Sequence, residues 1–197
     1  NLDYLLAKGL IRNIPTGVGE LDSLMHVAEE TSIPMEHLLT KDLAKREEIR
    51  SRDIRMLIMD CDGVLTDGAM IFSKNGDEIK RFNAKDGQGI KLFRHQGKLT
   101  GIISAGISTG LVEKRAEMLG VEHVYVGKHP KLEILKGWMD RLKLDFENIA
   151  YIGDDVTDIP ILEKVGASFC PADAVSAVKQ TAEVVLSLKG GEGCVRE

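Results

Sequence analysis

Two carboxylates, Asp60 and Asp62, stand two positions apart directly after an apolar run. Residues 56–59 are all apolar, as in a buried strand, and Gly63 permits a tight turn just after the acids. Unpaired carboxylates at the end of a buried strand are unfavourable, because removing each charge from water costs roughly several kcal/mol unless something compensates it. A divalent cation bound beside them would compensate for this cost. One carboxylate could then attack an electrophile while the other moves a proton.

A second acidic cluster follows another apolar run. Residues 149–152 lead through a glycine into Asp154. Because ligands of parallel α/β sheets bind at the carboxyl ends of the strands, Asp60, Asp62 and Asp154 are expected to lie together. Carboxylate oxygens are hard ligands, so this set suits Mg²⁺ rather than zinc or iron.

Two further acids of this cluster, Asp155 and Asp158, have two interpretations. They could hold metal-bound water or orient the loop, or either could be the N-cap of a helix beginning near residue 158. The sequence does not separate these roles.

Several separated motifs resemble those of the haloacid dehalogenase superfamily of phosphatases. The segments that carry the resemblance are DCDGVLTDG at 60–68, Lys131, GDDVTD at 153–158, FNAKDGQGI at 82–90 and GGEGCVRE at 190–197. The last two are similar to the capless subgroup that dephosphorylates 3-deoxy-D-manno-octulosonate 8-phosphate and related nonulosonate 9-phosphates. The resemblance covers about residues 53–197.

The resemblance implies a role for each matching acid and for one lysine. Asp60 would be the nucleophile, Asp62 the general acid and base, and Lys131 the cation that stabilises the transferring phosphoryl group. The implied Mg²⁺ ligands are Asp60, Asp62 through its carbonyl oxygen, Asp154 and Asp155.

The second family motif departs from its usual form. A Ser or Thr followed by Gly is expected at the end of the second strand, where this chain has Ser104, Ala105 and Gly106. An ungapped alignment puts Ala105 in the hydroxyl position, and a shift of one residue restores Ser104. We expect Ser104 to supply the phosphate-binding hydroxyl.

Further residues match family segments on the substrate side of the site. Lys85, Asp86 and Gly87 match a segment that lines the sugar side. Arg196 matches an arginine of the tail motif that approaches substrate, and a planar guanidinium suits the carboxylate of a sugar acid.

Strands and helices alternate from residue 55 onward, which predicts an α/β fold with a parallel sheet between helices. Expected strands are 56–60, 99–103, 122–126, 148–152 and 183–187. Expected helices are 87–96, 108–119, 131–142, 158–165 and 174–180. Residues 69–82 interrupt this alternation with a hairpin around Asn75-Gly76. The resemblance implies a Rossmann-like sheet with a hairpin flap, no cap domain, and a homotetramer whose neighbouring subunit closes the site.

The chain is expected to hold two segments: a small helical extension of unknown role at 1–54 and the phosphatase domain at 55–197. The formal net charge of −5 gives no electrostatic case for binding nucleic acid or an anionic membrane. No apolar run approaches the roughly 20 residues that span a bilayer. Three scattered cysteines favour reduced thiols in the cytosol.

The function that these observations favour is a cytosolic Mg²⁺-dependent phosphatase. It would hydrolyse a sugar-acid phosphate, foremost 3-deoxy-D-manno-octulosonate 8-phosphate, through an aspartyl-phosphate. Two alternatives stay open: a nonulosonate 9-phosphate phosphatase, and a catalytically weak domain that drives oligomerisation of an acylneuraminate cytidylyltransferase.

Overall fold

The chain divides into two compact units, residues 1–52 and 53–197. The computed structural model describes residues 5, 7–9, 20–31, 33, 35, 38, 42–106 and 109–197. The first unit contains helices α2 (Glu20–Thr31) and α4 (Leu43–Ser51) and a small apolar cluster around Leu5, Val27 and Leu38.

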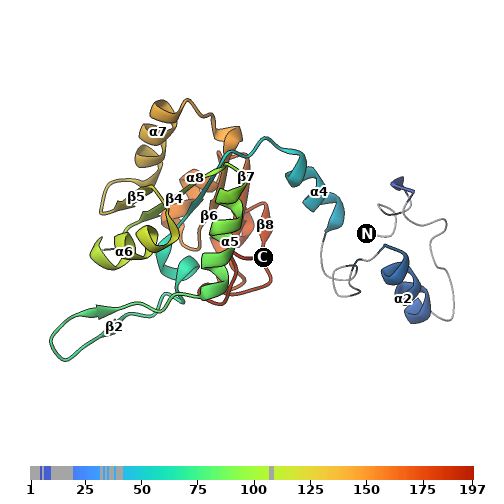
Figure 1. Cartoon of the computed structure of the whole chain (residues 1–197), viewed down its shortest axis with the longest axis horizontal. Coiled ribbons are helices and arrows are strands. Elements are labelled where there is room, and N and C mark those ends of the chain that lie inside the picture. The colour runs from blue at the N-terminus through green and yellow to red at the C-terminus, as the bar shows by residue number, and fades with distance from the viewer. Residues whose placement is uncertain are drawn as a thin grey trace. The chain divides into compact units, whose positions relative to one another are not determined.

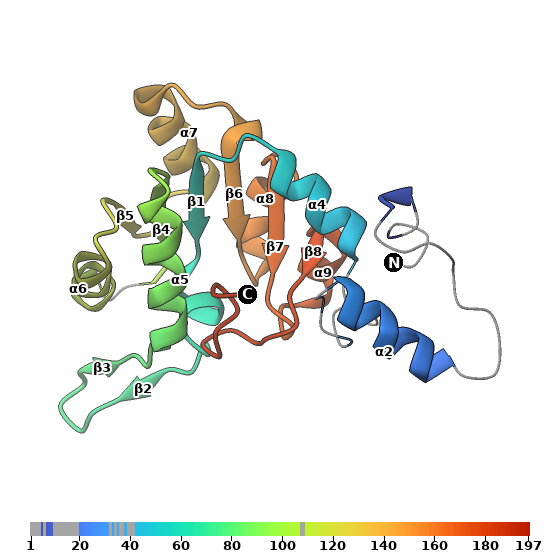
Figure 2. The ribbon, with the colours of Figure 1, turned by 45° about the vertical axis from the view of Figure 1, so that its right-hand side comes forward.

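The second unit is built on a six-stranded parallel sheet with the order β5-β4-β1-β6-β7-β8. Its strands are β1 (Met56–Met59), β4 (Leu99–Ser104), β5 (His123–Val126), β6 (Ile149–Ile152), β7 (Ala167–Cys170) and β8 (Val184–Val185). Figure 2 shows β1 beside β6 within the sheet. The chain therefore brings the two acid-bearing strands, β1 and β6, into direct contact.

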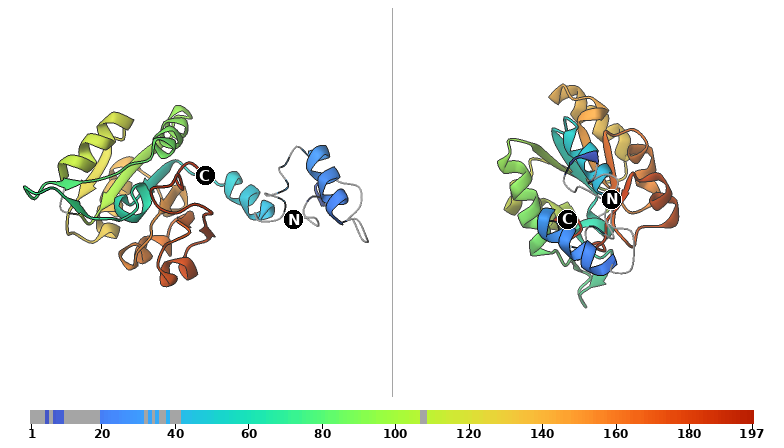
Figure 3. Two further views of the ribbon diagram at one scale, coloured as in Figure 1. Left: turned by 90° about the horizontal axis from the view of Figure 1, so that it is seen from below. Right: turned by 90° about the vertical axis from the view of Figure 1, so that its right-hand side faces the viewer.

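Helices cover both faces of this sheet. They are α5 (Ala84–His95), α6 (Thr109–Leu119), α7 (Lys131–Leu142), α8 (Ile159–Leu162) and α9 (Ser176–Thr181). Helices α5 and α6 pack together over one face, and α7 and α8 pack together over the other (Figure 3). The predicted α/β fold, with a parallel sheet sandwiched by helices, is confirmed.

The core explains why the central strand is so apolar. All four side chains of β1 are buried, because helices cover this strand from both sides. Met56 and Ile58 belong to the main apolar cluster together with Trp138 and Tyr151. Strand β1 is thereby held rigidly, and so is the acidic loop that follows it.

One strand was not predicted. Strand β7 has the sequence Ala-Ser-Phe-Cys, which shows neither a continuous apolar run nor a strict alternation. It is a strand because it pairs with β6, and the hydroxyl oxygen of Ser168 accepts the N–H of Glu183 beside it. Strand β8 was predicted as 183–187 and is only two residues long.

The predicted hairpin projects from the sheet as β2 (Ile71–Phe72) and β3 (Glu78–Ile79), paired antiparallel (Figure 1). Gly76 has a φ of 87°, which the turn after Asn75 requires. Its apolar side chains are exposed, by 58% at Phe72 and 50% at Ile79.

Among the helices of the described part of the chain, none is long and apolar enough to cross a membrane.

Candidate active site

The first acidic loop begins where β1 ends. The backbone N–H of Asp60 donates to the carbonyl oxygen of Ile152 at 2.9 Å, so Asp60 continues the pairing of β1 with β6. Its Oδ1 accepts the N–H of Cys61 at 2.6 Å. The chain then turns through η1 (Cys61–Leu65), where Gly63 has a φ of 84°. This turn leaves the Asp60 carboxylate at the end of the central strand, buried and fixed by the backbone.

Lys131 supplies the cation next to Asp60. It is the first residue of α7, it is buried, and its Nζ lies 2.7 Å from Asp60 Oδ2 and 2.7 Å from Asp158 Oδ1. Burial alone would lower the pKa of Lys131, but the adjacent Asp60 and Asp158 carboxylates raise it. The lysine therefore stays charged and joins the two acidic loops.

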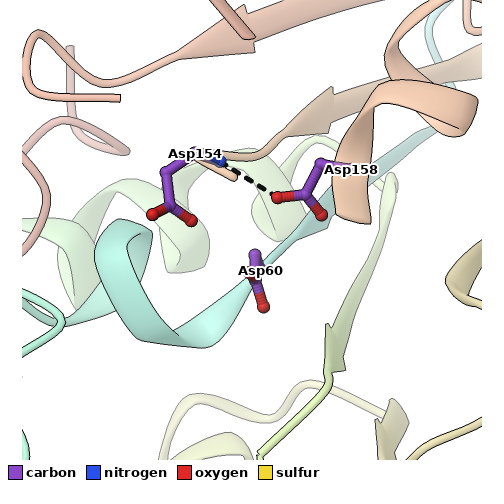
Figure 4. Close-up of side chains that lie close together, drawn as sticks. All are labelled: Asp60, Asp154 and Asp158. Carbon is purple, nitrogen blue, oxygen red and sulfur yellow. Dashed lines mark hydrogen bonds between the residues drawn. The ribbon is translucent and has the colours of Figure 1, made fainter. Parts of the chain in front are cut away.

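Asp158 orients the second acidic loop. It is fully buried at the end of η3 (Val156–Asp158), and its Oδ1 also accepts the Tyr151 hydroxyl at 2.5 Å. Its Oδ2 accepts the N–H groups of Asp154 and Asp155 at 3.0 and 3.2 Å, the first of which is drawn in Figure 4. Of the two interpretations of Asp158, the structure therefore favours the one in which it orients the loop.

Three carboxylates gather closely enough to hold a metal ion. One oxygen from each of Asp60, Asp154 and Asp158 lies within 4.8 Å of the others, and Figure 4 shows the three side chains grouped together. Asp154 Oδ1 is buried and has no hydrogen-bond partner among the described residues, so it is the ligand atom most in need of a cation. This all-oxygen set fits Mg²⁺.

The charges in this cluster are poorly compensated without a metal. The pKa of Asp60 is raised to about 7, because burial and the charge of Asp158 together outweigh the opposing effect of the nearby Lys131. Burial also raises the pKa of Asp154 to about 7, with added repulsion from Asp60 and Asp158. Three acids thus share the single ammonium of Lys131, and a divalent cation would stabilise their ionised forms.

A glycine is required where the two loops meet. A Cβ built on Gly63 would lie 2.0 Å from Asp154 Oδ2, closer than any side chain can approach. The glycine after the D-x-D pair therefore lets Asp154 come against the first loop, besides tightening the turn.

The other two predicted metal ligands lie differently. Asp155 is exposed, and its Oδ1 accepts the N–H of Val156 at 2.7 Å, so it caps η3. This is the capping alternative that the sequence left open. The side chain of Asp62 is not part of the cluster of three carboxylates, which leaves its carbonyl oxygen as the ligand atom predicted for this residue.

The Asp62 carboxylate has a partner that was not predicted. Lys80, just after β3, places its Nζ 2.5 Å from Asp62 Oδ1 and 2.9 Å from Glu78. The hydroxyl of Thr66 lies 3.3 Å from the same Oδ1. Lys80 stands in a run of mixed charges at residues 77–81, where the sequence carried no signal that singled it out.

Ser104 ends β4 at the same edge of the sheet. It is 1% exposed, and its Oγ accepts the N–H of Gly106 at 3.1 Å, whereas Ala105 is exposed. A Cβ on Gly106 would lie 3.1 Å from Ser104 Oγ and 3.2 Å from Asp62 Oδ2. Ser104 and Asp62 therefore face the same short turn, and the role of the Ser104 hydroxyl stays a prediction.

The tail motif packs on the first loop and on α5 of its own chain. The N–H of Gly191 donates to Val64, and the N–H of Arg196 donates to Asp86 Oδ1, both at 3.0 Å. Asp86 is 1% exposed and Gly87 is also buried. Asp86 therefore holds the tail, whereas a Cβ on Gly87 would meet Arg115 and Leu119 of α6. The predicted roles of both residues toward substrate stay predictions.

The two cations of this region are at the surface. Lys85 and Arg196 are both exposed, on the first turn of α5 and in the tail that crosses it. They remain available to a ligand, and their roles in substrate binding stay predictions.

Comparison with known proteins agrees with this site. Residues 117–195 match the model of the haloacid dehalogenase-like hydrolases. The 3-deoxy-D-manno-octulosonate 8-phosphate phosphatase of Escherichia coli K12 is 42% identical over 152 residues, which are 75% of this chain and 78% of that protein.

Solved structures show the same likeness. The Yersinia pestis enzyme of that name is 39% identical, with a TM-score of 0.72 over 75% of this chain and 79% of the other. The Moraxella catarrhalis enzyme, solved with magnesium ion, phosphate ion and a KDO molecule, is 31% identical, with a TM-score of 0.73 over 76% and 87%. The chain belongs to the haloacid dehalogenase-like hydrolases, in the family of the 3-deoxy-D-manno-octulosonate 8-phosphate phosphatases.

Proposed function

We propose that this chain is a Mg²⁺-dependent phosphatase that hydrolyses 3-deoxy-D-manno-octulosonate 8-phosphate through an aspartyl-phosphate. The observation that carries the proposal is the Asp60 carboxylate at the end of the central strand. It lies 2.7 Å from the Lys131 ammonium and close to Asp154, whose Oδ1 is buried and has no hydrogen-bond partner within the described part of the chain. A carboxylate held in this way can attack phosphorus, and an ammonium at its side can stabilise the charge that develops there.

In the first step, a carboxylate oxygen of Asp60 forms a bond to phosphorus while the bond from phosphorus to the sugar oxygen breaks. Asp62 donates a proton to that leaving oxygen, so the sugar departs as an alcohol. Lys131 balances the negative charge on the phosphoryl oxygens while the phosphoryl group moves from the sugar to Asp60. Mg²⁺ held by Asp60 and Asp154 would supply further neutralisation of the phosphate and the nucleophile.

In the second step, Asp62 removes a proton from water, whose oxygen bonds to phosphorus. The bond between phosphorus and the Asp60 oxygen breaks and inorganic phosphate leaves, so both residues return to their starting states, with Asp60 ionised and Asp62 protonated. That proton serves the next leaving group. The same residue therefore acts first as an acid and then as a base.

The substrate is proposed from the relatives and from the cations at the surface. Relatives at 39–42% identity carry the name of the octulosonate phosphatase. Exposed Arg196 and Lys85 could pair with the carboxylate of a sugar acid, which neutral sugar phosphates lack.

We also propose a homotetramer in the cytoplasm. The support for assembly is the exposed apolar surface of the hairpin, formed by Met70, Ile71, Phe72 and Ile79. The support for the compartment is that Cys61, Cys170 and Cys194 are all free thiols.

Phosphate release tests the substrate. The purified chain with Mg²⁺ should hydrolyse the octulosonate 8-phosphate at least about tenfold more efficiently than glucose 6-phosphate, since a charge-assisted pair contributes about 1.5–3 kcal/mol. A nonulosonate 9-phosphate belongs in the same panel, and a higher efficiency on it would replace the proposed substrate. Absence of turnover on every ester would support the oligomerisation-module alternative.

A further inference from the structure

Lys80 brings a buried cation from the hairpin to the Asp62 carboxylate. Its side chain is 6% exposed and its Nζ lies 2.5 Å from Asp62 Oδ1, while the Asp62 side chain is 37% exposed. Lysine is almost never buried unless it is paired, and here it is paired twice, since Glu78 lies 2.9 Å away. The pair joins two segments that are 18 residues apart in the chain.

The contacts distinguish the two oxygens of the Asp62 carboxylate. Within the described residues, Lys80 and the Thr66 hydroxyl both reach Oδ1, at 2.5 and 3.3 Å. Oδ2 lies on the other side, where a Cβ on Gly106 would be 3.2 Å from it. One oxygen is therefore anchored, and the other faces the turn after β4, at the edge of the sheet where the phosphate is proposed to bind.

An anchored carboxylate is an advantage for proton transfer. A half-exposed aspartate can rotate among several side-chain conformations, and only a proton donor held within hydrogen-bond reach of the leaving oxygen is effective. Two donors on Oδ1 restrict this rotation and leave Oδ2 for the proton.

We infer that Lys80 is a positioning residue for the general acid and base: it fixes the Asp62 carboxylate through Oδ1 so that Oδ2 serves the reacting oxygen. The inference rests on the proposed function, because it assigns Asp62 that role. It adds that the hairpin takes part in catalysis from within its own chain, through the residue that follows β3.

The test compares Lys80→Met with Arg81→Met, a matched control that removes the neighbouring hairpin cation. Arg81 pairs with Asp67 and its side chain is 73% exposed, so its loss does not touch Asp62. Lys80→Arg tests whether another cation restores the function. Each variant is assayed with Mg²⁺ on two substrates, p-nitrophenyl phosphate and 3-deoxy-D-manno-octulosonate 8-phosphate.

The two substrates separate the two uses of Asp62. Nitrophenolate leaves without needing a proton, so Lys80→Met should keep a stopped-flow burst of one nitrophenolate per site at the wild-type rate. Its steady-state turnover should then fall by about 10- to 100-fold, part of the 10²–10⁴ that acid–base catalysis contributes. Turnover of the sugar-acid phosphate should fall at least as far without a burst, with KM within about threefold of wild type. Lys80→Arg should recover most of the loss.

Other results would overturn the inference. Equal turnover in Lys80→Met and Arg81→Met would remove any role in catalysis. A rise in KM alone would make Lys80 a substrate ligand. Loss of the burst together with a lowered melting temperature would make it a structural contact of the hairpin. A wild-type protein without turnover on either ester would refute the proposed function itself, and the inference with it.

Discussion

At the scale of single residues, the site depends on how few cations serve its acids. Lys131 contacts Asp60 and Asp158 at the same distance of 2.7 Å, so one ammonium lies between the proposed nucleophile and the residue that orients the second loop. When a phosphate binds, it adds negative charge to this already acidic cluster. The metal is therefore needed for binding as much as for chemistry.

Replacement of Asp60, the proposed nucleophile, gives the most direct prediction at this scale. Asp60→Asn should lower turnover by at least about 10³-fold, because an amide of nearly the same shape cannot attack phosphorus. Phosphate release measures the loss, and circular dichroism should show an unchanged fold. Asp67→Asn is the control, since Asp67 is on the same loop and pairs with Arg81 at the surface. Turnover of Asp60→Asn near that of the control would exclude Asp60 as the nucleophile.

The sequence was sufficient to predict which reactive side chains gather at the strand ends. It was insufficient to predict which other residues hold those side chains in place. Asp60, Asp154 and Lys131 come together as expected because the strands and the helix that carry them follow clear patterns. The pairing of Lys80 with Asp62 could not be predicted, because it depends on how the hairpin folds back toward the first acidic loop. The hydrogen bond from the Arg196 N–H to Asp86 could not be predicted either, because it depends on how the tail packs on α5.

At the scale of elements, the tail fits tightly on the first loop. A Cβ on Gly190 would lie 1.9 Å from the carbonyl oxygen of Gly63. The backbone N–H of Gly190 also donates to Asp173 Oδ1 at 3.0 Å, which holds the tail backbone in this position. The loop that carries Asp60 and Asp62 is thus covered by a backbone that tolerates no side chain at Gly190.

Gly190→Ala should therefore displace the tail. We expect a loss of about 1–3 kcal/mol in the free energy of unfolding, typical of an overpacked site, and faster amide exchange in residues 190–197. Gly137→Ala is the control, since nothing lies within 4 Å of a Cβ at that helical position. There alanine should stabilise by about 0.5–1 kcal/mol. Equal stability of the two variants would show that the tail adapts without cost.

The hairpin is the element whose surface most needs a partner. Phe72 is 58% exposed in β2, and its neighbours Met70 and Ile71 are exposed by 70% and 47%. Phe72→Lys should break the proposed tetramer into smaller species, as light scattering would detect. Leu92→Lys changes an exposed leucine of α5 and should leave the assembly intact. A wild-type monomer with full activity would contradict the proposed assembly.

Element boundaries were predictable where apolar runs were long. Strands β1, β4, β5 and β6 begin and end within one residue of the expected positions, and α7 matches its expected range. Strand β7 was missed because its four residues, Ala-Ser-Phe-Cys, show no alternation of apolar and polar side chains. It is a strand because it pairs with β6.

For the whole molecule, metal, pH and stability should be linked. The pKa values of Asp60 and Asp154 are raised from 3.8 to about 7, chiefly by burial. A raised acid contributes stability below its unfolded pKa and loses it as the pH rises through its folded pKa. The metal-free protein should therefore melt at lower temperature at pH 8 than at pH 5.5.

Mg²⁺ should reverse this trend, because it binds the ionised carboxylates. At a fixed concentration of about 100 times its Kd at pH 8, Mg²⁺ should stabilise the fold by about 2.7 kcal/mol at that pH. The same concentration should give a smaller shift in melting temperature at pH 5.5, where protons compete for the carboxylates. Asp154→Asn should remove most of this Mg²⁺ shift. A shift that is the same at both pH values, or unchanged in Asp154→Asn, would contradict the metal site.

The strand order also determines when the two acidic loops can meet during synthesis on the ribosome. Strand β1 is central, and its acid-bearing end is completed only when β6 pairs with it. At about 5–20 residues per second, Asp60 emerges several seconds before Asp154. During that interval β1 lacks its pairing with β6, and Asp60 lacks the neighbouring carboxylate of Asp154. The proposed site therefore forms only after most of the sheet has been synthesised.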